Sequence, residues 1–259
     1  MKLFCILCWG VFMVSVFSGF TEAGELKIDE HTLFLCHYNK SLDADYAKGD
    51  PSHHGVAFLT EQGRYGKALD ASSEGGYQRL SYKTEGNINP DEGTLEMWVK
   101  MKFTVKEAVL ETPLTFLPPS KREKVKPKLK YGRCYFFSCR NNPENQFFLY
   151  LGETMHLFFY EVKNGGGTWS TRIVGTDLSR DWRKDEWHHI AVTWSKSAGK
   201  KCLFIDGKLV NEGKTTGLCT PFTEMTVGSF MGCWKAEAVI DEVRISDIVR
   251  YTKDFVLDN

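Results

Sequence analysis

The feature that most constrains the fold is the regular alternation of side chains along residues 94–102. In an extended chain, successive side chains point to opposite faces. One face would carry Leu95, Met97, Val99 and Met101, and the other Glu96, Trp98, Lys100 and Lys102. A period of two is typical of a strand with one buried face. We therefore expect a half-buried β-strand here.

Further segments carry strand signals, and no long window has a convincing helical period. The segment 202–210 contains Asp206-Gly207 between two apolar runs, which predicts a hairpin with a type I′ turn. The other predicted strands are 33–38, 147–151, 157–162, 187–194, 225–228 and 238–246. Many short strands separated by turn residues favour an all-β fold of two packed antiparallel sheets.

The N-terminal segment resembles a secretory signal peptide. Lys2 precedes an apolar run over residues 3–17, and Thr21-Glu22-Ala23 ends in small residues suited to cleavage after Ala23. A membrane anchor is the alternative, but the run is shorter than the ~20 residues that span a bilayer. We expect residues 1–23 to be a signal peptide and 24–259 a single secreted domain, extracellular or, in a bacterium, periplasmic. We expect no membrane span.

The charge balance of the chain bears on the kind of partner that it can bind. The chain has 33 basic and 33 acidic residues, and this balance argues against nucleic acid as a partner of the whole protein. Hydrophobic residues make up 42% and aromatic residues 14%, which is typical of a folded domain rather than a disordered chain.

Six of the eight cysteines lie beyond the predicted signal peptide. An even number in an exported protein suggests disulfide bonds. The candidates are Cys36, Cys134, Cys139, Cys202, Cys219 and Cys233. Cys134 and Cys139 are five positions apart on one apparent strand, so they would face opposite sides unless a bulge intervenes. Asn39 begins the sequon Asn39-Lys40-Ser41, a glycosylation site if the source is a eukaryote.

A basic insertion interrupts the strand pattern at residues 112–133. Four prolines lie in this range, and residues 120–133 hold seven basic side chains against one acidic side chain. Such a segment should form an exposed loop. A sharper hypothesis is a docking patch for acidic or sulfated glycans. Its residues would include Lys121, Arg122, Lys124, Lys126, Lys128 and Lys130.

Several segments together resemble a known family. They are GKALD (66–70), GTLEMWVK (93–100), WHHIAVTW (187–194), LFIDGKLV (203–210) and IDEVRI (240–245). Their order resembles the laminin-G-like jelly roll of the concanavalin A-like lectin/glucanase superfamily, over about residues 32–255. The resemblance implies a jelly-roll sandwich that binds glycan or protein, sometimes with calcium.

The superfamily also contains glycoside hydrolases, which place two carboxylates across the scissile bond. On one strand this chemistry would need acids two positions apart, and no segment carries such a Glu-x-Asp-x-Glu pattern. His188 and His189 are adjacent, so they would point to opposite faces and could not serve one site. We identify no catalytic residue.

Asp241 is the most informative carboxylate, because it shares a predicted face with Val239, Val243 and Ile245. A carboxylate among apolar side chains needs proton donors or a cation. Hydrogen bonding to loop backbone is one interpretation. The other is a structural calcium ion. The resemblance implies that the first and last strands lie side by side, so that Asp43, Asp45, Asp50 and Asn39 of the first loop could be further ligands.

Aromatic rings offer a second kind of site, because they can cover the apolar faces of sugars. The candidates are Trp169, Trp182 and Trp234, which fall in expected loops or strand ends. Any of the three could instead be a packing residue.

The sequence thus favours a secreted, non-catalytic, lectin-like module that binds an extracellular glycan or glycoprotein, with calcium as its possible cofactor. A glycoside hydrolase or lyase on the same fold is one alternative. A structural or adhesion protein acting through protein contacts is the other.

Overall fold

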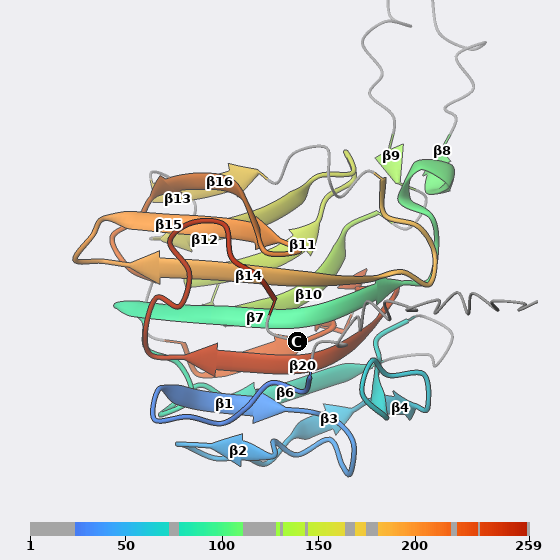
Figure 1. Ribbon diagram of the computed structural model, residues 1–259, viewed down its shortest axis with the longest axis horizontal. Helices are drawn as coiled ribbons and strands as arrows, with labels where there is room; N and C mark the ends of the chain where they lie inside the picture. The colour runs from blue at the N-terminus through green and yellow to red at the C-terminus, as the bar shows by residue number, and fades with distance from the viewer. Residues whose placement is uncertain are drawn as a thin grey trace, which may run out of the picture.

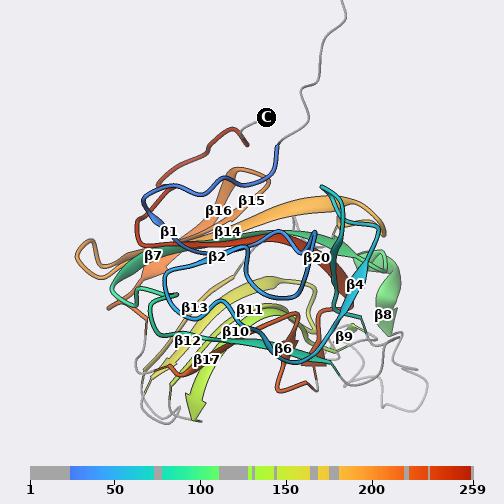
Figure 2. The ribbon, with the colours of Figure 1, turned by 90° about the horizontal axis from the view of Figure 1, so that it is seen from below.

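The computed structural model describes residues 24–72, 78–110, 128–129, 132–142, 145–163, 169–174, 181–218, 222–232 and 234–257. Within these ranges the regular structure is almost entirely β, with a single turn of 3₁₀ helix, η2, at Val105–Ala108. All strand pairs are antiparallel, and two large sheets stack face to face (Figures 1 and 2). The expected all-β sandwich is confirmed.

Sheet 1 is built around β7, which lies between strands that are distant in sequence. Its spatial order is β16 (Lys208–Lys214), β15 (Lys200–Ile205), β14 (Trp187–Ser195), β7 (Glu92–Met101), β20 (Ala238–Ser246), β1 (Thr32–Cys36) and β2 (Tyr46–Ala47). β5 (Ala68–Asp70) also pairs with β20, and β4 (Phe58–Thr60) pairs with β5.

Sheet 2 forms the opposite layer of the sandwich. Its order is β13 (Trp169–Val174), β12 (Leu157–Lys163), β11 (Asn145–Leu151), β10 (Cys134–Asn142), β17 (Glu224–Val227), β6 (Arg79–Lys83) and β3 (His54–Val56). Two small ribbons pair β18 (Ser229–Phe230) with β19 (Trp234–Lys235), and β8 (Val109–Leu110) with β9 (Lys128–Leu129).

The predicted strands are all present, although their ends shift by a few residues. The hairpin turn is also confirmed: Asp206 and Gly207 have φ angles of 50° and 75°, as a type I′ turn requires. The predicted set lacked the short edge strands β2, β3 and β4, which carry too few residues to show a period, and it also lacked β6 and β13.

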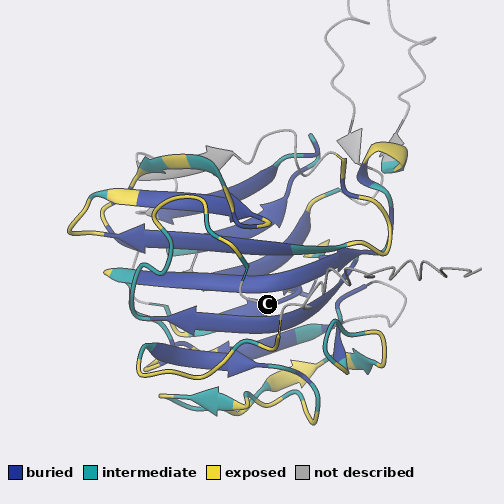
Figure 3. Ribbon diagram, in the orientation of Figure 1, coloured by how far each residue is buried: buried dark blue, intermediate teal, exposed yellow. Residues whose placement is uncertain are grey.

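The expectation that β7 is half-buried is wrong. Glu96 and Trp98, on the polar side of its pattern, are 0% and 5% exposed. The reason is a second covering layer, because the segments at both ends of the domain run across the outer face of sheet 1 (Figures 2 and 3).

The core between the sheets is rich in aromatic rings. The ring of Phe147 on β11 packs against Phe159 at 5.2 Å and against Trp194 of the opposite sheet at 6.1 Å. Gly93 lies opposite Trp194 in the β7–β14 register. A Cβ at this glycine would come within 2.5 Å of the indole, so the tight contact requires glycine.

The predicted disulfides are not formed by the described cysteines. Cys36, Cys134 and Cys202 are buried free thiols, whereas Cys219 and Cys233 lie outside the described residues. Cys134 and Cys139 do not face opposite sides. A bulge in β10 shifts the register by one residue, and both side chains lie in the core.

A buried ion pair joins the two sheets. The Lys201 Nζ on β15 lies 3.2 Å from the Glu161 Oε2 on β12, and both side chains are almost fully buried. The Thr215 hydroxyl donates to the same carboxylate at 3.2 Å. The ammonium also lies 4.7 Å from the centre of the Phe159 ring. Each charge therefore depends on the other for its stability inside the sandwich.

Removing one member of this pair should destabilise the fold. We expect Lys201→Met to cost about 3–5 kcal/mol in urea unfolding, since Glu161 would be left buried without its cation. The double variant Lys201→Met/Glu161→Leu should recover much of that loss. Lys196→Met, in the exposed pair with Asp91, is the matched control and should change little. A loss at Lys201 no larger than that of the control would contradict this account.

Candidate functional site

The outer face of sheet 2 carries an unusual concentration of aromatic side chains. An outward-facing sheet surface normally carries polar residues. Here a buried cluster away from the main core is formed by Tyr135 on β10, Phe148 and Tyr150 on β11, and Phe158 on β12, with Tyr160 and Phe230 packed against it. The four central rings are buried, so the partly exposed rings packed against them are the ones open to contact.

The β18–β19 ribbon places two more rings beside this cluster. Phe230 stacks on Tyr135 at 5.1 Å, and Trp234 stacks on Phe230 at 5.5 Å with the ring planes 14° apart. Tyr135 also stacks on Tyr150 at 4.9 Å. Trp234 is 47% exposed, so part of its ring is open to solvent.

The bulge in β10 is the local reason for this arrangement. Tyr135 pairs with Tyr150, and the next registered pair is Phe137 with Leu149, so one extra residue is inserted between them. Phe136 and Phe137 both lie in the core, while Tyr135 points outward. The strand therefore keeps its apolar contacts and still presents a ring to the outside.

These rings line a hollow that we call the aromatic groove. It encloses about 320 Å³, at the lower end of the usual ligand-pocket range. Its lining is Arg133, Tyr135, Gln146, Phe148, Tyr150, Tyr160, Val162, Phe230 and Trp234. A second hollow of about 220 Å³ continues from Phe230. It is lined by Arg79, Ser138, Arg140, Thr223, Glu224, Thr226, Phe230 and Met231.

Polar groups surround the rings. Arg79 forms an ion pair with Glu224, and the Arg133 Nε lies 3.7 Å from the Glu153 Oε1. Burial raises the pKa of Tyr135 even though the nearby Arg133 guanidinium opposes that change. Tyr135 is therefore a neutral hydroxyl at physiological pH.

Comparison with known proteins places the chain in a family. A family model described as the concanavalin A-like lectin/glucanases superfamily, of laminin-G type, matches residues 125–254, half of the chain. The chain belongs to this superfamily. The resemblance found in the sequence is thereby confirmed. No curated protein matches the chain.

Solved structures show the same fold. The receptor binding domain of botulinum neurotoxin mosaic serotype C/D has a TM-score of 0.59 and 10% identity, over 88% of this chain and 48% of that chain. The binding domain of botulinum neurotoxin DC, in complex with rat synaptotagmin II, has a TM-score of 0.56 and 14% identity, over 83% and 48%. This chain thus spans about half the length of these toxin domains.

A third similar structure is a single domain that the alignment covers over nearly its whole length. Domain 4 of an extracellular arabinanase from Geobacillus stearothermophilus, in complex with arabinotriose, has a TM-score of 0.53 and 15% identity. The alignment covers 84% of this chain and 94% of that one. At such low identity these likenesses establish the fold alone.

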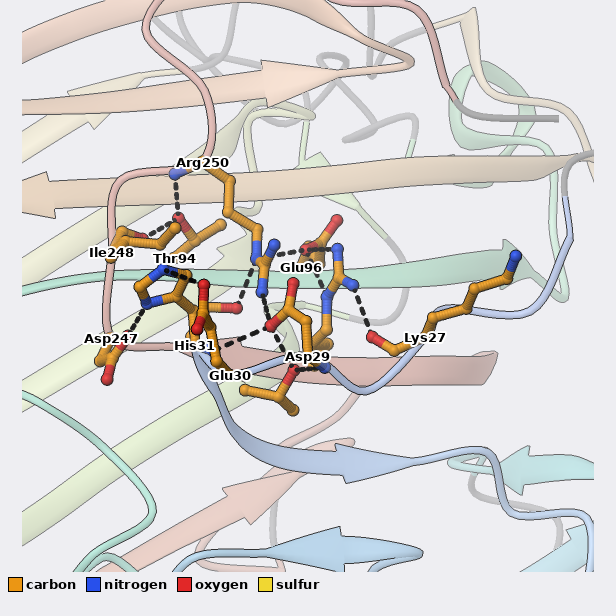
Figure 4. A network of polar contacts seen from close by, with 12 residues as sticks. Lys27, Asp29, Glu30, His31, Thr94, Glu96, Asp247, Ile248 and Arg250 are labelled. Atoms are coloured by element: carbon orange, nitrogen blue, oxygen red, sulfur yellow. Dashed lines mark hydrogen bonds and ion pairs between the residues drawn. The ribbon is translucent and has the colours of Figure 1, made fainter.

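The outer face of sheet 1 differs sharply from that of sheet 2, because it centres on a buried carboxylate (Figure 4). Glu96 accepts hydrogen bonds from Arg244 at 2.7 Å and from Tyr251 at 2.9 Å, and His189 contacts it at 3.2 Å. Burial acts to raise the pKa of Glu96, but the His189 hydrogen bond and the Arg244 charge outweigh it and lower the pKa to about 2.

The same network ties both terminal segments to the sheet. The Arg244 Nη1 donates to the Lys27 carbonyl at 3.0 Å, and the Arg250 Nη2 donates to the Asp29 Oδ1 at 2.7 Å (Figure 4). Tyr251, in the C-terminal segment, bonds Glu96 directly. The polar groups on this face thus bond one another and hold the chain ends in place.

Asp241 does not share a face with Val243 and Ile245 as predicted. A bulge in β20 between Asp241 and Arg244 shifts the alternation, and Asp241 lies opposite Trp98 on the outer face. Its Oδ2 accepts from the backbone N–H of Arg64 at 2.8 Å, its Oδ1 from that of Glu242 at 2.9 Å. Burial raises the pKa of Asp241 to about 7, with the Glu242 charge adding to the effect.

The predicted calcium ligands do not fit one ion. Asp241 is used by backbone donors, the Asp43 Oδ1 lies 2.6 Å from the His53 Nδ1, and the Asp45 Oδ2 accepts from the His37 N–H at 2.7 Å. In the ranges that the structure describes, no three His, Cys, Asp or Glu side chains form a group that could hold a metal. Calcium binding itself stays a prediction.

The three predicted tryptophans have different environments. Trp234 lies on the aromatic groove. Trp182 is 1% exposed and stacks on His188 at 4.6 Å, so it is a packing residue and the prediction of a ligand contact is corrected. Trp169 lies at a strand end, as the first residue of β13, and its side chain is outside the described part, so its role as a ligand contact stays a prediction.

Other predicted features fall largely outside the described residues. The predicted signal peptide does so entirely, as do Lys121, Arg122, Lys124, Lys126 and Lys130 of the basic insertion, while Lys128 lies in β9. Asn39 is half-buried. Its Oδ1 accepts from the Lys67 N–H at 2.9 Å and its Nδ2 donates to Glu25 at 3.0 Å; its glycosylation stays a prediction. No helix in the described ranges is long and apolar enough to cross a bilayer.

Sequence reasoning missed most of the groove. The signal was present in Phe148 and Tyr150 and again in Phe158 and Tyr160, where aromatic residues occupy alternate positions on the face opposite the core. Runs that are apolar on both faces predict strands covered on both sides. This pattern alone could not show that a ribbon carrying Trp234 would lie beside them.

Replacing Glu96 should change the response of stability to acid. A carboxyl whose pKa is lowered in the folded state stabilises the fold above its unfolded value of 4.5, and this contribution is lost as pH falls toward 2. We expect Glu96→Gln to lower the free energy of unfolding at pH 7 by about 3 kcal/mol. The difference from the wild type should shrink as pH falls from 4.5 to 2.

Denaturant melts across this pH range measure the effect. Glu85→Gln, at an exposed position outside the network, is the control and should leave the profile unchanged. A constant difference between wild type and Glu96→Gln at every pH would contradict the proposed role of the charge.

Proposed function

We propose that this chain is an extracellular, non-catalytic module that binds a glycan or glycan-bearing partner through the aromatic groove. The observation that carries the proposal is the aromatic outer face of sheet 2 with the half-exposed Trp234 at its edge. Hydrophobic surface of this kind marks a site of interaction when it lies on a folded domain.

The chemistry of the groove suits a sugar. Pyranose and furanose rings present C–H faces that stack on aromatic rings, while their hydroxyls need hydrogen-bonding groups at the edges. Trp234 and Phe230 offer ring surface, and Gln146, Arg133 and the Tyr160 hydroxyl lie in the same lining. Because these groups stand on paired strands, little ordering is needed on binding.

The similar structures are consistent with such a role. One is an arabinanase domain in complex with arabinotriose, and others are toxin domains that bind receptors. One of these toxin domains is bound to synaptotagmin II, a protein, so a protein partner is the second candidate. Extracellular location, with residues 1–23 as signal peptide, is part of the same proposal.

A hydrolase on this groove would need two carboxylates across the bond that it cleaves. Among the described residues that line the two hollows, Glu224 supplies the single carboxylate, and it is paired with Arg79. This favours binding over hydrolysis. Reducing-sugar release from a polysaccharide panel tests the alternative, and turnover lost on substitution of Glu224 would establish it.

Glycan-array binding tests the main proposal. We expect wild-type protein to bind a subset of glycans and Trp234→Ala to weaken that binding at least about tenfold, since burying a large apolar side chain contributes on the order of 1.5–3 kcal/mol. Phe58→Ala, at a similarly exposed aromatic residue on sheet 1, is the matched control. Unchanged binding by Trp234→Ala, or no glycan bound by folded protein, would contradict the proposal.

A further inference from the structure

Of the two hollows on sheet 2, one is lined mainly by aromatic rings and the other contains Arg79 and Arg140. This difference narrows the class of saccharide that the site would bind. We propose that the aromatic groove selects acidic saccharides, those with a carboxylate or sulfate group, and that Arg140 is the residue that binds the acidic group. This inference rests on the glycan-binding role proposed above and adds the substrate class.

The first observation is the charge of the lining. Over both hollows the described lining contains three arginines, Arg79, Arg133 and Arg140, against one acid, Glu224. The protein as a whole is balanced, with 33 basic and 33 acidic residues. This face therefore carries a local positive excess, which attracts an anionic ligand.

The second observation concerns the partners of these arginines. Arg79 is paired with Glu224, and Arg133 has Glu153 at 3.7 Å. In the described part of the chain, Arg140 forms no ion pair: Glu224 stands opposite it in the β10–β17 register, but the Glu224 carboxylate is paired with Arg79. It donates to the Met231 thioether and lies 5.7 Å from the centre of the Phe230 ring.

A thioether sulfur is a weak acceptor, and a guanidinium has five N–H donors. Arg140 thus keeps donors for a ligand, and its guanidinium lies beside Met231 and Phe230 in the lining of the hollow. A planar guanidinium can bind a carboxylate or a sulfate through two parallel hydrogen bonds.

The third observation is position. Phe230 lines both hollows, so it is the point at which the aromatic groove meets the arginine-lined hollow. A sugar that stacks on Phe230 and Trp234 would place a ring substituent next to Arg140. Ser138 and Thr226 line the same hollow and can bind the remaining hydroxyls. The ring stack and the charge contact can therefore be made by one saccharide.

The test compares matched oligosaccharides of equal length: neutral, uronate-containing and sulfated. Titration calorimetry should show that the wild type prefers at least one acidic series by about tenfold or more, since a hydrogen bond to a charged group is worth about 1.5–3 kcal/mol. Binding of the acidic series should weaken as salt rises. The uronate and sulfate arms identify which anion is preferred.

Three variants locate the effect. Arg140→Gln should lose the preference for acidic saccharides and retain affinity for neutral ones, and Arg140→Lys should lose part of the preference. Arg183→Gln, at an exposed arginine outside the groove, should bind as the wild type does. Melting temperatures of all variants show whether they fold. The salt dependence of the wild type serves as a readout if Arg140→Gln does not fold.

The outcomes separate this inference from the proposed function. If neutral and acidic saccharides bind equally, and Arg140→Gln changes neither, selectivity by Arg140 is overturned while glycan binding stands. If no saccharide binds, both proposals fall. If an acidic peptide binds in the groove and saccharides do not, the substrate class assigned here is wrong.

Discussion

Two β-bulges control which side chains each face of the sandwich receives. A strand in a sandwich must keep its apolar side chains toward the core, and strict alternation would then fix every other residue as outward. The bulge in β10 turns Tyr135 outward while Cys134 and Cys139 both stay inside. The bulge in β20 puts Asp241 and Arg244 on the outer face. Both the aromatic groove and the Glu96 network depend on these insertions.

The outward-facing side chains of the two sheets differ in chemistry and in how they are covered. Sheet 1 carries charged side chains on its outer face, and the terminal segments cover them, so that Glu96 and Arg244 satisfy each other in a buried network. Sheet 2 carries aromatic rings on its outer face, and only a short ribbon lies beside them, leaving Trp234 half-exposed. The polar groups on sheet 1 bond one another, whereas on sheet 2 the central rings are buried by their neighbours and Trp234 at the margin stays open to solvent. This asymmetry is why the proposed binding site lies on sheet 2.

The aromatic groove should be more rigid than a binding site built from loops. Its floor is formed by hydrogen-bonded strands, and Phe147 and Phe159 anchor those strands in the core from the other side. Rings held in this way lose little conformational freedom on binding. The arginines at the margin add charge to a surface that is otherwise apolar, and this combination is what the proposed acidic saccharide would need.

The sequence by itself determined the fold class, the superfamily and the main strands, because alternation and the Asp206-Gly207 turn are local properties of the chain. It also identified Trp234 as a candidate contact. It misplaced Asp241 and treated Trp182 as a possible ligand contact, because a bulge and a stacked histidine are invisible to a fixed period of two. Only the tertiary structure brought Tyr135, Phe230 and Arg140 together from strands up to 95 residues apart. That assembly depends on the long-range pairing of β10 with β17 and on packing of the β18–β19 ribbon against β10, which no local pattern encodes.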